Sequence, residues 1–201
     1  MNKNFSVAIS FAVTTVLVAH HVADPLPIGA PLPDPVKKMK DITGSELSFQ
    51  DVMKKNGLLV MFSCNTCPIV RAYQTRTNEV CQYAQEKQIG VVLLNSNEGN
   101  RDGGDSFDDM KQYAGQQGYK WPYLLDDHSA MAAAFSASRT PECFLFNAAG
   151  KLVYHGAIDN NASSPGAVTR KHLMIAMDEM LSGKEISVKT TRSVGCTIRR
   201  A

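Results

Sequence analysis

Short, continuously apolar runs alternate along this chain with longer segments in which apolar residues recur at helical spacing. Residues 58–62 (L-L-V-M-F) and 91–94 (V-V-L-L) are two such runs, and each has the pattern of a strand buried on both faces. Between them, from Ile69 to Ala84, apolar residues fall on one face of a helix. This order predicts a βαβ unit.

The second half of the chain predicts three helices, a short strand and a β-hairpin. The hairpin consists of residues 143–146 and 151–158, joined by an Asn-Ala-Ala-Gly turn. The other elements follow from local apolar spacing: helices near 106–113, 129–135 and 164–181, and a strand at 123–125. Residues 184–201 are expected to form a C-terminal tail.

The segment before the first buried strand is expected to be mostly extended. Residues 24–35 hold five prolines in twelve positions. Leu47 and Phe49 alternate with polar residues, as in a short strand. Asp51 is the expected N-cap of a brief helix that ends before Asn56-Gly57.

The first 23 residues have the pattern of a secretory signal. Lys3 precedes an uncharged, mostly apolar run at 5–19, shorter than the ~20 residues that a membrane-spanning helix needs. We therefore expect residues 1–23 to be a signal peptide or a retained N-terminal anchor, and residues 24–201 to be one exported domain that includes the tail. A buried N-terminal helix is the alternative.

Composition indicates a globular protein and excludes some classes of partner. Hydrophobic residues make up 44% of the chain and charged residues 20%, which is typical of a globular protein with a core. The net charge is +2 and Lys and Arg form no block, so nothing indicates a nucleic-acid partner. Beyond an N-terminal anchor, nothing indicates a membrane partner either.

Two cysteines carry the chemistry that the sequence predicts. Cys64 and Cys67 lie in F-S-C-N-T-C-P, directly after the first buried strand. If the helix begins at Cys64, its thiol lies beside unpaired backbone N–H groups and the positive end of the helix dipole, which favours the thiolate. Cys67 then follows one turn later, and Pro68 falls in the first turn, where proline is tolerated. The pattern is that of a nucleophilic thiol with a resolving partner.

A second motif gives these residues a family resemblance. Thr140-Pro141 directly precedes the strand C-F-L-F, where the thioredoxin fold has its cis-proline. Together with I-G-A-P near the start, N-S-N-E after the second strand and V-G-C-T-I-R at the end, residues 27–201 resemble the thioredoxin superfamily, and within it bacterial redoxin-type, TlpA-like thiol-disulfide oxidoreductases. The resemblance implies an α/β, thioredoxin-like fold with a central mixed β-sheet flanked by helices. It implies no cofactor beyond a redox-active disulfide.

The resemblance also implies what the site residues do. Cys64 becomes the attacking thiol, Cys67 the resolving thiol, Pro141 the cis-proline beside them and Thr140 a backbone contact for the substrate chain. Cys64 would attack a disulfide and form a mixed disulfide, which Cys67 would resolve. The partners would be protein thiols or disulfides and an unidentified redox donor, in the bacterial periplasm.

Two positions depart from the thioredoxin pattern. Thioredoxins carry a buried aspartate six residues before the first cysteine, where this chain has Leu58. Another group must therefore transfer the proton, and Glu98 and Glu142 are the candidates. The dipeptide between the cysteines is Asn-Thr, neither Gly-Pro nor Pro-His, so the redox potential cannot be taken from a relative.

A thiol-dependent peroxidase is the first alternative function. Peroxiredoxins share much of this architecture and carry the signature P-x-x-x-[T/S]-x-x-C. Counting back from Cys64, Met61 stands at the hydroxyl position and Gly57 at the proline position. Both positions fail, which disfavours a dedicated peroxidase.

A metal carrier is the second alternative, with copper as the candidate metal. The C-x-x-C pair supplies two thiolate ligands, but a zinc site needs a second pair at similar spacing. The remaining cysteines are scattered singly, and thioredoxin-like copper carriers usually have C-x-x-x-C. No metal site is therefore predicted. A purely structural disulfide within C-x-x-C is disfavoured because it closes too short a loop.

The three other cysteines receive separate interpretations. Cys81 lies beside the apolar face of its helix and is expected in the core. Cys143 lies two residues after Pro141, so on a strand it points to the same side and is a candidate extra redox thiol. Cys196 lies in a tail expected to be mobile, and is a second candidate that could pair with Cys143 or Cys81 or anchor the tail. The acidic segment 98–109 does not match a calcium motif and is expected to be a solvated loop.

Overall fold

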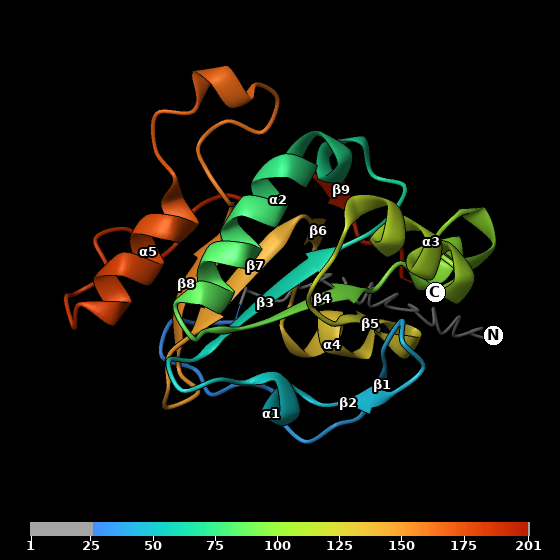
Figure 1. Cartoon of the computed structure of the whole chain (residues 1–201), viewed down its shortest axis with the longest axis horizontal. Coiled ribbons are helices and arrows are strands. Elements are labelled where there is room, and N and C mark those ends of the chain that lie inside the picture. The colour runs from blue at the N-terminus through green and yellow to red at the C-terminus, as the bar shows by residue number, and fades with distance from the viewer. Residues whose placement is uncertain (1–25, 201) are drawn as a thin grey trace, which may run out of the picture.

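The computed structural model describes residues 26–200 and has at its centre a five-stranded mixed sheet with the strand order β5-β4-β3-β7-β8 (Figure 1). Strands β3, β4 and β5 are parallel, and β7 and β8 are antiparallel to their neighbours. The strands are β3 (Leu58–Ser63), β4 (Gly90–Asn95), β5 (Tyr123–Leu125), β7 (Glu142–Phe146) and β8 (Leu152–Gly156). The predicted α/β fold with a mixed sheet is confirmed.

Helices cover both faces of the sheet. Side chains of a strand point alternately to its two faces, and β3 is buried along its whole length, so both faces must be covered. Leu59 and Met61 of β3 face a core that includes α2 (Pro68–Glu86), α3 (Phe107–Gln117) and α5 (His172–Leu181). Leu58, Val60 and Phe62 face the opposite core, with α1 (Phe49–Val52) and α4 (Ala130–Ala134). The second core is aromatic: Phe135 makes edge contacts with Phe49, Phe62, Phe144 and Phe146.

Short elements complete the chain around this sheet. A two-stranded ribbon of β1 (Met39–Lys40) and β2 (Glu46–Leu47) precedes α1. Within residues 26–200, the connections contain 3-10 helices at Glu98–Gly103, Asp127–Ser129 and Pro165–Ala167. Helix α1 is capped by Ser48, and not by Asp51 as expected. Asp51 is instead the third helical residue and closes a capping box, accepting the Ser48 N–H at 2.7 Å.

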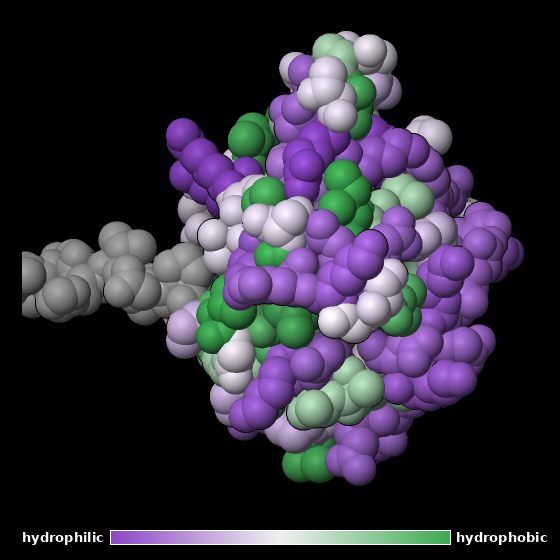
Figure 2. Space-filling view, turned by 90° about the vertical axis from the view of Figure 1, so that its left-hand side faces the viewer, coloured by the Kyte–Doolittle hydropathy of each residue, from purple (hydrophilic) through white to green (hydrophobic). Residues whose placement is uncertain are grey.

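The last helix is shorter than the predicted 164–181. It begins at His172, because the side chain of Asn160 holds the preceding segment in a closed loop. Its oxygen accepts hydrogen bonds from the backbone N–H groups of Thr169 and Arg170, at 3.0 and 3.1 Å. The face that carries α5 and this loop is mostly hydrophilic, with separate hydrophobic side chains between the polar ones (Figure 2).

The tail is not loose, contrary to expectation. Its strand β9 (Cys196–Thr197) pairs antiparallel with β6 (Arg139–Thr140), directly before Pro141. Ile198 is 5% exposed and packs into the aromatic core. An apolar anchor and a strand pairing therefore fix the end of the chain against the body of the fold.

The expected signal peptide or anchor, residues 1–23, lies outside the described residues and stays a prediction. Between residues 26 and 200, none of the helices combines the length and apolar character needed to cross a bilayer.

Candidate active site

Cys64 lies where β3 ends, between the sheet and α2. Its side chain is fully buried, and its Sγ lies 3.3 Å from the Thr140 hydroxyl oxygen. Helix α2 begins at Pro68 with Cys67 as its N-cap, so the expectation that the helix begins at Cys64 is wrong. Burial raises the pKa of the Cys64 thiol above its ordinary value, although the Thr140 hydroxyl and two backbone N–H groups favour the thiolate. The expected lowering of this pKa is therefore not found.

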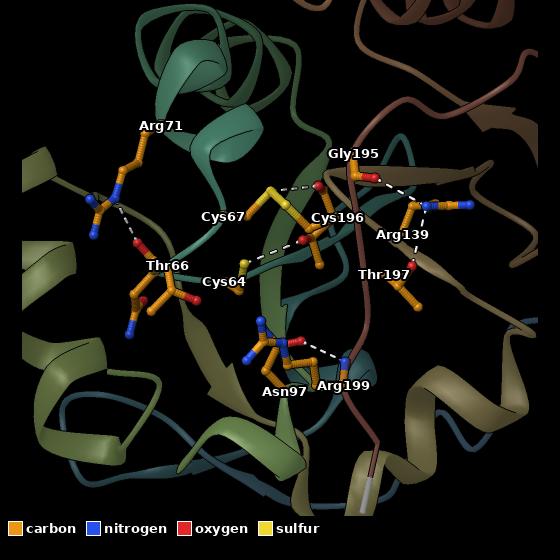
Figure 3. Close-up of a disulfide and its surroundings, with 12 residues drawn as sticks. Cys64, Thr66, Cys67, Arg71, Asn97, Arg139, Gly195, Cys196, Thr197 and Arg199 are labelled. Atoms are coloured by element: carbon orange, nitrogen blue, oxygen red, sulfur yellow. Dashed lines mark hydrogen bonds between the residues drawn. A yellow bond between two sulfur atoms is a disulfide. The ribbon is translucent and has the colours of Figure 1, made fainter. Parts of the chain in front are cut away.

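Cys67 is bonded to Cys196 of the tail, with a Cα–Cα distance of 5.9 Å (Figure 3). Cys64 remains a free thiol in this form. The tail makes this pairing through its register, because Cys196 lies opposite Thr140 in the β6–β9 ladder. The pairing of Cys196 with Cys81 or Cys143 considered from the sequence is thus not the one formed. The Cys64–Cys67 couple stays a prediction.

Thr140 connects the three cysteines of the site. Its hydroxyl contacts Cys64, its carbonyl oxygen lies 3.5 Å from the Cys67 sulfur, and its backbone pairs with Cys196. The Thr140–Pro141 peptide bond is cis. The predicted residues Cys64, Cys67 and Thr140 therefore lie together, and Cys196 joins them.

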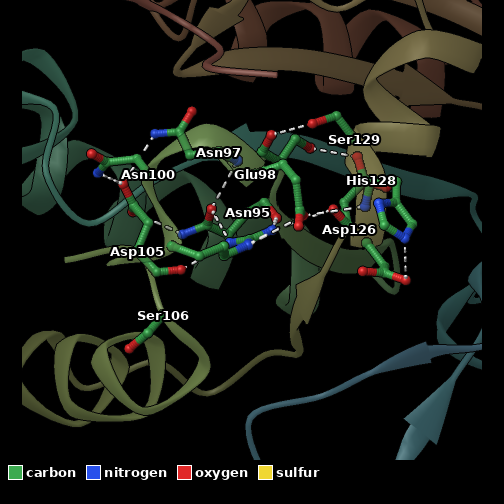
Figure 4. Close-up of polar contacts among 12 residues, drawn as sticks. Asn95, Asn97, Glu98, Asn100, Asp105, Ser106, Asp126, His128 and Ser129 are labelled. Carbon is green, nitrogen blue, oxygen red and sulfur yellow. Dashed lines mark hydrogen bonds and ion pairs between the residues drawn. The ribbon is translucent and has the colours of Figure 1, made fainter. Parts of the chain in front are cut away.

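Asp105 organises the loop between Cys64 and Cys67, which the sequence analysis did not anticipate. Its side chain is fully buried, so at this position the expected solvated loop is wrong. One carboxylate oxygen accepts the Asn65 N–H at 2.7 Å, and the other accepts the Thr66 hydroxyl at 2.8 Å. Side-chain amides complete the network (Figure 4), from Asn95, Asn97 and Asn100.

Asp105 stays ionised although it is buried, because these groups donate hydrogen bonds to its carboxylate. Burial opposes ionisation, but the hydrogen bonds from Asn65, Asn100 and the other amides outweigh it and hold the pKa of Asp105 below its ordinary value. The negative charge also contributes to the raised pKa of Cys64. The signal in the sequence was the density of Asn and Asp between residues 95 and 105, which indicates a polar network as readily as a solvated loop.

The two proton-transfer candidates make their hydrogen bonds elsewhere. Glu142 accepts from the Ser138 and Arg139 N–H groups and pairs with His155 Nε2 at 2.7 Å. Glu98, on the 3-10 helix after β4, contacts the Arg101 guanidinium and accepts the His128 N–H. Within residues 26–200, neither carboxylate has a hydrogen bond to a cysteine of the site.

Cys81, on α2, and Cys143, on β7, are buried in the core between the sheet and this helix, and both are free thiols. Cys143 pairs across the sheet with Met61 and Gly156. The structure does not group it with Cys64, Cys67 and Cys196, which share a separate small apolar cluster with Val70. Burial raises the pKa of both core thiols.

A pocket of about 340 Å³ lies away from the cysteines, between α2 and α5. It is lined mainly by aliphatic side chains and by the Arg76–Asp159 ion pair. In the described part of the chain, one group of three potential metal ligands lies within 4.8 Å, formed by Glu98, Asp127 and His128. It contains no cysteine, so it does not bear on the predicted thiolate chemistry.

Comparisons with solved structures show that other proteins share this fold. An uncharacterized conserved protein from Geobacillus kaustophilus superposes with a TM-score of 0.81 at 30% identity, over 87% of this chain and 93% of that one. A hypothetical protein from Sinorhizobium meliloti 1021 gives 0.81 at 27% identity, over 89% and 97%. A putative thiol:disulfide interchange protein DsbE from Chlorobium tepidum gives 0.61 at 17% identity, over 78% and 99%, and shows the shared fold alone.

Sequence comparison assigns the family. No curated protein matches the chain. Residues 27–170, which include Cys64, Cys67, Thr140 and Pro141, match the family described as Redoxin. That range is more than half of the chain, and the thioredoxin-like neighbours agree with it. The chain therefore belongs to the Redoxin family.

Proposed function

We propose that this protein is a thiol-disulfide oxidoreductase that exchanges disulfides with protein substrates through Cys64 and Cys67. One observation carries the proposal: a free thiol and a disulfide sulfur contact the same residue, Thr140, at 3.3 and 3.5 Å. A nucleophile and a resolving sulfur at one point are what stepwise disulfide exchange requires. The structural neighbour described as a thiol:disulfide interchange protein is consistent with this chemistry.

The reaction starts from the reduced protein, because both Cys64 and Cys67 must be thiols and Cys67 is otherwise bonded to Cys196. The Cys64 thiolate attacks one sulfur of the substrate disulfide, and the other substrate sulfur leaves as a thiolate. Cys67 then attacks the Cys64 sulfur, which forms the Cys64–Cys67 disulfide and releases the second substrate thiol. Two electrons pass to the substrate, and an external dithiol must return them.

The residues around the sulfurs support this sequence of steps. The Thr140 hydroxyl and the N–H groups of Cys67 and Thr66 favour the Cys64 thiolate against the effect of burial. Asp105 fixes Asn65 and Thr66, and so keeps the two cysteines at a constant separation. No metal or organic cofactor is needed for any step.

Trapping of the mixed disulfide tests the proposal. Reduced full-length protein is mixed with insulin as the disulfide probe, quenched with acid, alkylated and mapped by mass spectrometry. In the Cys67→Ser variant we expect an insulin chain to accumulate on Cys64, because the resolving thiol is gone. The Cys64→Ser variant should give no adduct and no insulin reduction, while Cys81→Ala, which removes a core thiol, should behave like the wild type.

Other results would exclude Cys64 as the nucleophile or favour one of the two alternative functions. Insulin reduction at the wild-type rate by Cys64→Ser would exclude Cys64 as the nucleophile. Hydrogen peroxide consumption by the reduced protein, without reaction with insulin, would favour a peroxidase. Stoichiometric copper on the reduced protein, lost in Cys67→Ser, would favour a metal carrier.

The proposal includes export to the bacterial periplasm, with residues 1–23 as the signal or anchor. Its support is the sequence pattern of a basic residue followed by a short apolar run. N-terminal sequencing of the protein from a periplasmic fraction tests it. A mature chain that retains Met1 and stays in the cytoplasm would contradict it.

A further inference from the structure

We propose that Cys196 is a third redox-active cysteine. Cys67 forms its disulfide either with Cys64 or with Cys196, and the bond moves between these two partners. The inference rests on the proposed function, since it adds a step to the same reaction. It assigns Cys196 a chemical role, while the residues that follow it hold the tail in place.

Cys67 shares one site with both other cysteines. It is bonded to Cys196, while the Cys64 sulfur lies against the hydroxyl of Thr140, the same residue whose carbonyl contacts Cys67. All three cysteines belong to one small apolar cluster. The nucleophile that would open the Cys67–Cys196 bond is therefore already inside the site.

Cys196 stays near Cys67 when their bond opens. The residues that follow it are held by non-covalent contacts on several segments. Ile198 is buried in the core, and its N–H donates to Ser138 O at 3.0 Å. The Arg199 N–H donates to the Asn97 side chain at 3.0 Å, and the Arg200 guanidinium donates to Ala137 O at 2.7 Å. Re-formation of the bond is thus intramolecular, with the high effective concentration that this gives.

Of these three cysteines, Cys196 is the one that solvent reaches. Cys64 and Cys67 are buried, at 0% and 3% exposure, whereas Cys196 is partly exposed. An external dithiol therefore meets the disulfide at Cys196. The tail cysteine connects a buried nucleophile to the redox donor.

The exchange step balances without an external reagent. The Cys64 thiolate attacks the Cys67 sulfur, the Cys64–Cys67 bond forms, the Cys67–Cys196 bond breaks, and Cys196 leaves as a thiolate. One proton leaves Cys64 and one is taken up by Cys196, and no electrons are gained or lost. Run in reverse after a catalytic turnover, the step returns Cys64 to the thiol form and moves the disulfide to the accessible side.

This electron balance gives a sharp test. Full-length protein is equilibrated in glutathione buffers from reducing to oxidising, quenched with acid and mapped for both disulfides. The summed fraction of protein that carries either disulfide must follow the glutathione potential. The ratio of the two disulfides must stay constant at every potential, because interconversion consumes no electrons. In Cys196→Ser, only Cys64–Cys67 should form.

A second variant displaces the tail without touching a sulfur. A Cβ on Gly195 would lie 2.0 Å from the Thr140 carbonyl oxygen, so Gly195→Ala must push β9 away from β6. We expect the ratio to shift toward Cys64–Cys67 by about tenfold, the effect of a typical overpacking cost. Gly166→Ala is the matched control, because a Cβ there meets nothing within 4 Å, and it should leave the ratio unchanged.

The outcomes separate this inference from the proposed function. If Cys196→Ser forms Cys64–Cys67 and reduces insulin, the proposed function stands whatever the tail does. If the wild type and Gly195→Ala then show only one of the two disulfides at every potential, or a ratio that changes with potential, the third-cysteine role is overturned. If Cys196→Ser never forms Cys64–Cys67, both proposals fall.

Discussion

Thr140 acts on Cys64 through its hydroxyl and on the tail through its backbone, and substitution can separate these two effects. Thr140→Val keeps the β-branched shape and the strand pairing but removes the hydroxyl contact at 3.3 Å. Because that contact lowers the pKa of Cys64 against the effect of burial, we expect the pKa to rise further. Alkylation of Cys64 by iodoacetamide in the reduced protein at pH 8 should slow about tenfold.

The matched variant for this prediction is Thr140→Ser, which restores a hydroxyl. It should recover most of the wild-type alkylation rate, whereas a purely structural role would make both substitutions equivalent. Equal rates in Thr140→Val and wild type would show that the hydroxyl does not influence the thiolate.

Asp105 illustrates a residue whose role depends on the whole network and not on its neighbours in sequence. In Asp105→Asn, one oxygen must replace a carboxylate that accepts five hydrogen bonds, and the new NH2 group faces donors. We expect the free energy of unfolding to fall by about 3 kcal/mol at pH 7. The pKa of Cys64 should fall, because the nearby negative charge is gone.

The pH dependence provides the check on Asp105. Its pKa is lower in the folded than in the unfolded state, so its stabilising effect is complete above the unfolded value of ~3.9 and is lost as the pH falls through the folded value. Urea unfolding should therefore show a difference between wild type and Asp105→Asn that narrows below about pH 4. A difference that stays constant down to pH 2 would contradict a role for the charge.

At the scale of elements, the N-cap of α3 follows Asp105 directly and fixes where the polar loop ends. The Ser106 hydroxyl accepts the Asp109 N–H at 3.1 Å, and Asp109 accepts the Ser106 N–H in return. Ser106→Ala should lower the free energy of unfolding by about 1 kcal/mol. Ser106→Thr should retain most of the stabilisation that the cap provides, because threonine also caps helices. Ser45→Ala, at an exposed turn position, should have no effect, and an equal loss there would remove capping as the cause.

The sequence predicted well those elements whose signal is local. The runs at 58–62 and 91–94 became β3 and β4 within a residue of their expected ends, because a fully buried strand needs an unbroken apolar run. The last helix was predicted eight residues too long at its start, because the Asn160 side chain, ten residues away, holds the segment before it. Tertiary contacts also made a strand of the tail, where no local pattern indicates one.

The candidate site divides in the same way. The spacing of Cys64 and Cys67 and the Thr140-Pro141 dipeptide are sequence signals, and the structure places these residues together. The Cys67–Cys196 bond joins residues 129 positions apart, and no spacing rule connects them. The burial of Asp105 requires donors from separate segments, which local composition cannot show.

At the scale of the whole molecule, the cysteines form two sets in different parts of the fold. Cys64, Cys67 and Cys196 gather beyond the end of β3, where segments from both halves of the chain meet. Cys81 and Cys143 lie inside the main core with the aliphatic and aromatic side chains of α2 and α5. The second set has no role in the proposed reaction, but its burial has a consequence for stability.

That consequence is a loss of stability at alkaline pH. Burial raises the pKa of Cys81 and Cys143 in the folded state, while the unfolded chain loses these protons near the ordinary value of ~8.5. Above that pH the folded state binds more protons than the unfolded state, so the free energy of unfolding falls as pH rises, by up to about 1.4 kcal/mol per pH unit for each thiol. Urea unfolding of the reduced protein between pH 7 and 9, where tyrosines with their ordinary pKa of ~10 contribute little, measures this slope. The double variant Cys81→Ala/Cys143→Ala should be less stable at pH 7 but show a shallower decline. Equal slopes in the two proteins would mean that the core thiols ionise as readily in the folded chain as in the unfolded one, which their complete burial opposes.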